Sequence, residues 1–108
     1  MVYHIDEYKP NTEDLAFVIS GADWCEPCKR VLEFCESLSE QYPDVCFIHV
    51  DVEKSPEFVK KWKIMSLPTC MLFQGGVQVE RLVGFKPKIE VQRILERALL
   101  KVKEGRLI

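Results

Sequence analysis

The feature that most limits the fold is a short apolar segment at residues 15–20, which Gly21 ends. A run of this length, rich in strand-forming residues and without polar alternation, is typical of a β-strand buried on both faces. Residues 45–52 form a second apolar segment with the same character. Because such strands need cover on both sides, the two segments predict an α/β fold.

A helix is expected between these two strands. Asp23 is a candidate N-cap, with Glu26 three residues later in a capping-box relation. Apolar residues then recur at helical spacing as far as Tyr42, and Pro43 stops the helix. This strand–helix–strand unit predicts two parallel neighbours in one sheet.

The second half of the chain predicts a short helix, a hairpin and a long helix. The short helix is expected at residues 55–62, and strands at residues 69–73 and 77–83 flank a turn with two glycines. Pro87 opens the last helix. Its buried face is expected at Val91, Leu95, Ala98 and Val102.

The order of these elements predicts a central mixed sheet of four to five strands, the extra one at residues 3–5, with helices on both faces. Strands joined through helices should be parallel and the hairpin antiparallel. The 108 residues fit one domain, 1–108, with a frayed tail at 103–108.

Composition and charge exclude several classes of function. A net charge of −2 gives no reason to expect nucleic acid or an anionic membrane as a partner. The longest apolar run is far shorter than the ~20 residues that span a bilayer, and no export signal is visible. Since the five cysteines are an odd number, most thiols should be free, and we expect a reducing, cytoplasmic location.

The chemistry is predicted by Cys25 and Cys28, which are separated by two residues at the start of the first helix. This spacing brings the sulfurs within disulfide range, and a helix N-terminus stabilises a thiolate. We expect Cys25, nearest the strand, to be the exposed nucleophile and Cys28 to be the shielded resolving thiol. The pair predicts thiol–disulfide exchange through a mixed disulfide.

The alternative to redox chemistry is half of a structural zinc site. Such a site needs two more ligands in a compact cluster. The remaining candidates are scattered singly along the chain, at His4, Cys35, Cys46, His49 and Cys70. We therefore predict no metal, and expect the extra cysteines to be structural, with redox regulation through Cys70 as the lesser alternative.

Glu26 lies between the two cysteines and would oppose thiolate formation at Cys25. A carboxylate about 6 Å away costs ~2 pKa units at an effective dielectric near 20, and about half a unit when fully solvated. Lys29 acts in the opposite direction. We expect Glu26 to be exposed and its effect to be small.

From about residue 15 to residue 102, the chain resembles the thioredoxin family. The family motif Trp-Cys-Gly-Pro-Cys-Lys stands here as Trp24-Cys25-Glu26-Pro27-Cys28-Lys29. The second signature is a cis-proline followed by Thr, which Leu67-Pro68-Thr69 matches. Compared with the family, the segment before Trp24 is short, so the first helix, near residues 11–14, should be reduced to a turn.

The resemblance implies a dithiol reductase of protein disulfides, without a cofactor of its own, that receives electrons from NADPH through thioredoxin reductase. It also implies a monomer, with cis-Pro68 against the cysteine pair. Phe85 either joins the docking surface or is ordinary packing. The residues implied for substrate binding are Trp24, Pro27, Leu67, Pro68, Thr69 and Gly84.

Two departures from the family concern proton transfer. Thioredoxins place a buried Asp six residues before the first cysteine, where this chain has Ile19, and a Lys nearby, where it has His49. His49 either replaces the missing base as a proton relay, since imidazole titrates in the useful range, or only fills the space. Both readings stay open at this point.

Two other functions remain. The same fold can serve as a binding or adaptor module with little redox turnover, and the loss of the buried Asp and the presence of Glu26 favour that reading. Retention of both thiols argues against it, because an adaptor needs neither. An oxidase or isomerase of the secretory route is disfavoured by the missing export signal.

Overall fold

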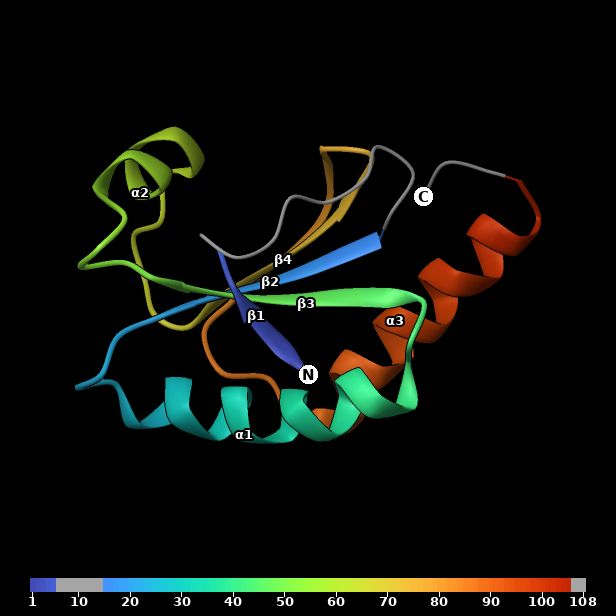
Figure 1. The fold of residues 1–108 in the computed structure, drawn as a ribbon, viewed down its shortest axis with the longest axis horizontal. Coiled ribbons are helices and arrows are strands. Elements are labelled where there is room, and N and C mark those ends of the chain that lie inside the picture. The colour runs from blue at the N-terminus through green and yellow to red at the C-terminus, as the bar shows by residue number, and fades with distance from the viewer. Residues whose placement is uncertain (6–14, 106–108) are drawn as a thin grey trace.

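A five-stranded sheet forms the centre of the computed structural model, which describes residues 1–5 and 15–105 (Figure 1). The central strand is buried at every position, which confirms the prediction for the first apolar segment. In spatial order the strands are β1 (Val2–His4), β3 (Val45–Asp51), β2 (Leu15–Gly21), β4 (Thr69–Gln74) and β5 (Val77–Val83).

Helices cover both faces of the sheet, as predicted. Helices α1 (Glu26–Gln41) and α3 (Lys88–Lys103) lie on one face, and the short α2 (Pro56–Trp62) lies on the other (Figure 1). Each helix in the described part of the chain is too short or too polar to cross a membrane. The expectations for residues 11–14 and 106–108 fall outside the described residues.

One predicted strand direction is wrong. β2 and β3 are parallel and the β4–β5 hairpin is antiparallel, as expected, but β4 runs antiparallel to β2 although a helix precedes it. Seven-residue α2 advances only about 10 Å, whereas seven-residue β3 spans about 23 Å. The chain therefore starts β4 near the edge where β3 ended, and Thr69 pairs with Ser20 at the end of β2.

The predicted capping box at the start of α1 is also wrong. The N-cap is Cys25, whose Sγ accepts a hydrogen bond from the Cys28 N–H at 3.3 Å. Asp23 is exposed and lies two residues before the cap, because Cys25 N–H donates to the Ala22 carbonyl in a turn that delays the helix. The predicted end of the helix is confirmed, since Tyr42 forms the C-cap.

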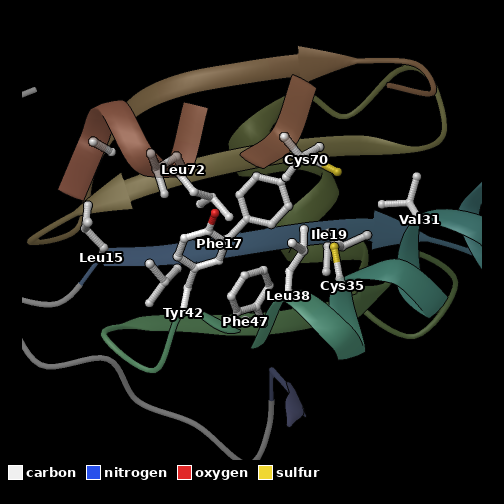
Figure 2. Packing of buried hydrophobic residues seen from close by; sticks show 14 residues of the cluster. Leu15, Phe17, Ile19, Val31, Cys35, Leu38, Tyr42, Phe47, Cys70 and Leu72 are labelled. Atoms are coloured by element: carbon white, nitrogen blue, oxygen red, sulfur yellow. The ribbon is translucent and has the colours of Figure 1, made fainter. Parts of the chain in front are cut away.

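The larger hydrophobic cluster lies between the sheet and the helices α1 and α3 (Figure 2). The rings of Phe17 and Phe47 meet there at 5.6 Å between centroids. Of the stripe expected on the last helix, three members are buried and Val102 is half-buried. A second cluster, which includes Met71 and Val50, fills the space below α2.

Two of the extra cysteines belong to the larger cluster, as expected for structural residues. Cys35 of α1 and Cys70 of β4 are free thiols buried beside Ile19 (Figure 2). Burial raises the pKa of the Cys35 thiol far above its usual range, and nearby Cys70 and Glu36 raise it further. Burial also raises the pKa of Cys70 to about 12, so both thiols stay protonated at neutral pH.

Ser20 and Thr69 are paired across β2 and β4, and their two buried hydroxyls provide a matched test of hydrogen bonding in the core. The Thr69 hydroxyl donates to the Ser66 carbonyl at 2.6 Å, whereas the Ser20 hydroxyl has no hydrogen-bond partner among the described residues. Thr69→Val should therefore lower the free energy of unfolding by about 1 kcal/mol. Ser20→Ala should leave it unchanged or raise it by up to about 1 kcal/mol.

Urea unfolding of both variants and the parent chain checks this pair. A loss of stability in Ser20→Ala similar to that in Thr69→Val would contradict the assignment of the two hydroxyls.

Candidate active site

The site lies at the edge of the sheet where β2 and β3 end and β4 begins. β2 ends at Gly21, and five residues later, at Glu26, the chain enters α1. Cys25 and Cys28 are joined in a disulfide across the first turn of α1, with their Cα atoms 5.2 Å apart. The prediction that this spacing brings the two sulfurs together is confirmed.

The predicted difference in exposure between the two cysteines is wrong for the disulfide form. Cys25 is 6% exposed and Cys28 is 4% exposed. Both are covered because Ala22, Val52 and Leu67 pack against them. The cysteines differ instead in what they face, since Cys25 lines an open groove and Cys28 is not among the residues that line it.

That groove has a volume of about 380 Å³ and a mostly apolar lining. Trp24 is 68% exposed at its rim, and its indole N–H donates to the Glu53 carboxylate at 2.9 Å. Met65, in the loop between α2 and β4, is 91% exposed. The complete lining consists of Trp24, Cys25, Val52, Val59, Ile64, Met65, Ser66 and Leu67.

Sequence reasoning found Trp24, Cys25 and Leu67 but missed the other residues of the groove. Val52 follows β3, and Val59 belongs to α2, so both come from segments that motif comparison did not single out. The available signal was topological, because the carboxyl ends of neighbouring parallel strands meet at one edge. That rule would have brought Val52 beside the cysteines.

The Leu67–Pro68 peptide bond is cis, as predicted. However, Pro68 and Thr69 are buried, so their side chains do not form part of the open surface. The Thr69 hydroxyl holds the loop through Ser66, and Gly84 N–H donates to the Pro68 carbonyl at 2.8 Å. Gly84 has a φ of +84°, which an L side chain rarely adopts.

Among the other predicted docking residues, Pro27 is half-buried in the first turn of α1. Phe85 packs on α1 and is also 40% exposed. Its ring lies 6.5 Å from that of Phe34 in an edge contact, and the Arg30 guanidinium lies 4.8 Å above it. These contacts hold the segment after β5 against α1.

Glu26 is 78% exposed and forms an ion pair with Lys29 at 3.1 Å. The expected exposure of this carboxylate is therefore confirmed. Because its charge is solvated and partly balanced by Lys29, we expect its effect on the Cys25 thiol to be weak.

His49 is half-buried on β3, beside Ile19 of β2 in the sheet register. Burial lowers the pKa of its imidazole, and the charge of nearby His4 lowers it further. The carboxylates of Asp51 and Asp23 oppose this shift. Ile19 is buried in the core and offers no proton acceptor.

In residues 1–5 and 15–105, no three His, Cys, Asp or Glu side chains come together in a way that would hold a metal ion. The two cysteines are instead joined to each other. A cysteine pair in the first turn of a helix, next to an open apolar groove, can exchange with a bound partner: as a disulfide with the partner's thiols, and as a dithiol with the partner's disulfide. The site is therefore that of a thiol–disulfide oxidoreductase.

Comparison with known proteins identifies the family. The thioredoxin family model matches residues 6–97. A thioredoxin of Chlamydia trachomatis is 36% identical over 76 residues, which cover 70% of this chain and 74% of that protein. A thioredoxin of Staphylococcus aureus is 34% identical over 79 residues, covering 72% and 76% respectively. The chain belongs to the thioredoxin family.

Solved structures agree with the fold. A poplar thioredoxin h gives a TM-score of 0.82 at 28% identity, covering 91% of this chain and 96% of that chain. A thioredoxin of Plasmodium falciparum gives 0.73 at 34% identity, covering 79% and 82%. The predicted thioredoxin fold, a mixed sheet between helices, is thereby confirmed.

The exposure of Glu26 leads to a prediction for the reduced protein. Glu26→Gly should lower the pKa of the Cys25 thiol by less than one unit, because a solvated carboxylate acts weakly on its neighbour. Titration of thiolate absorbance measures this pKa, and Lys29→Gln should shift it slightly in the opposite direction. A fall of more than one unit in the Glu26 variant would show that the carboxylate is poorly screened.

Proposed function

We propose that this oxidoreductase acts as a reductase of disulfides in other proteins, with Cys25 as the attacking thiol and Cys28 as the resolving thiol. The observation that carries the assignment is that Cys25 lines the groove and Cys28 does not. A substrate disulfide held in the groove would reach Cys25 first.

The reaction proceeds in two exchanges. The Cys25 thiolate attacks one sulfur of the substrate disulfide, that bond breaks, and the other substrate sulfur leaves as a thiolate that takes a proton. The Cys28 thiolate then attacks Cys25 Sγ in the mixed disulfide. The Cys25–Cys28 bond forms and the second substrate thiol is released, so two electrons pass to the substrate.

The first exchange is supported by the position of Cys25. Cys25 is the N-cap of α1, where the helix dipole and the Cys28 N–H favour a negative charge on sulfur. The apolar lining of the groove, with Trp24 and Met65 both strongly exposed, suits an extended peptide with apolar side chains. Leu67, which precedes the cis-proline, also lines this groove.

Membership of the thioredoxin family supports a proposed role in an electron chain. The protein acts as a cytoplasmic monomer without a cofactor of its own, and thioredoxin reductase returns the disulfide to the dithiol with electrons from NADPH. Protein disulfides are then the substrates.

A binding module with little turnover is the second candidate. Buried Ile19 favours it, since this residue supplies no proton acceptor beside the resolving thiol. The cysteine pair favours the reductase, because groove binding alone requires no disulfide.

Reduction of insulin, driven by NADPH and thioredoxin reductase, separates these two functions. The intact protein should give continuous turnover, while Cys25→Ser and Cys28→Ser should each abolish it. If the intact protein shows no turnover with reductases from several sources, while peptides still bind to the groove, the binding module is the correct function.

A further inference from the structure

Gly21, at the end of β2, has no side chain and lies close to both Cys28 and His49. A Cβ built on Gly21 would lie 3.3 Å from Cys28 Sγ and 3.6 Å from His49 Nε2. Since both distances start at one point, sulfur and nitrogen are no farther apart than the sum, 6.9 Å. A proton can cross such a distance through one bridging water, or directly after a small side-chain rotation.

The apolar side chains that pack with Cys28 offer no proton acceptor. The side chains packed with it in the small cluster at the sheet edge, those of Ala22, Val52 and Leu67, are apolar. Ile19, two residues before Gly21 on β2, is also apolar and buried. Among these residues, the imidazole facing Gly21 is the one group that can take a proton from the Cys28 thiol.

The surroundings of His49 favour a neutral ring in the resting protein. Its Nδ1 is buried and has no hydrogen-bond partner among the described residues. In the neutral tautomer that leaves Nε2 able to accept a proton, Nδ1 carries the hydrogen. The ring also meets that of His4 in an edge contact, 5.8 Å between centroids. Burial and His4 lower the pKa of His49, which leaves it able to accept a proton at neutral pH.

Carboxylates on the other side can stabilise the charged ring once it forms. A cavity of about 350 Å³ beside His49 is lined by Asp51 from β3 and Asp23 from the loop before α1. Lys54 and His4 line the same cavity and act in the opposite direction. Two carboxylates thus favour the charged ring and two basic groups oppose it, so His49 can both accept a proton and release it again.

We propose that His49 Nε2 accepts the proton of the Cys28 thiol in the second exchange, and that Gly21 positions the two groups by leaving the space between them open. The inference rests on the proposed reductase function. The Cys28 S–H bond breaks and an N–H bond forms at Nε2. The thiolate then displaces the substrate sulfur from Cys25, and the imidazolium returns its proton through solvent to the released substrate thiolate.

Stopped-flow reaction with dithionitrobenzoic acid tests this step by itself. This aromatic disulfide releases one coloured thiolate when Cys25 attacks and a second when Cys28 resolves the mixed disulfide. All variants carry Cys46→Ser, which removes a half-buried thiol outside the site. His49→Gln should slow the second release at least about tenfold at pH 7 and change the first less than about twofold.

A second variant tests the titration. His4→Phe keeps a ring against His49 but removes its charge, so the His49 pKa should rise. Since the neutral ring is the acceptor, the midpoint of the pH dependence of the second release should move to higher pH. Chemical shifts of the His49 ring nitrogens give the same pKa without any turnover, and a role in packing alone would leave the pH dependence of release unchanged.

The role of Gly21 is tested by a double-variant cycle. Gly21→Ala should slow the second release, and adding His49→Gln should slow it no further, because both changes break one path.

An unchanged second release in His49→Gln, or equal slowing of both releases, would overturn the inference. Additive effects of the two changes would overturn the positioning role of Gly21. If the protein with His4, Gly21 and His49 unchanged gives no first release, that result would instead count against the proposed function itself.

Discussion

The site depends on the fact that α1 begins at the cysteine that lines the groove. Cys25 has an extended backbone as the N-cap, and its sulfur accepts the Cys28 N–H that the helix leaves unpaired. The same turn brings the two Cα atoms to 5.2 Å, which allows a disulfide. One local conformation thus supplies both the bond and the stabilisation of the thiolate when the bond is open.

The sheet places that turn against the groove. Because α2 is too short to return the chain along β3, β4 starts at the edge where β2 and β3 end. The cis-proline loop therefore comes to the cysteines, and the hydroxyl of Thr69 and the N–H of Gly84 hold it there. The strand direction that the sequence pattern missed is the feature that completes the site.

Local patterns predicted much of this structure. The apolar segments, the hairpin turn with two glycines and the proline-bounded helices reproduced the elements nearly to the residue, since each depends on nearby side chains. The direction of β4, the burial of Cys25 and the position of Thr69 below the surface depend on contacts between distant segments. Motifs therefore identified the chemistry, whereas Val52 and Met65 of the groove emerged only from the fold.

The central claim is that Cys25 meets the substrate first, and trapping of the mixed disulfide tests it most directly. Cys28→Ser should form a stable covalent adduct with a disulfide-containing protein such as insulin, attached at Cys25 as located by peptide mass spectrometry. Cys25→Ser should form none under the same conditions. An adduct at Cys28 in the Cys25→Ser variant, with none at Cys25 in its counterpart, would contradict the account.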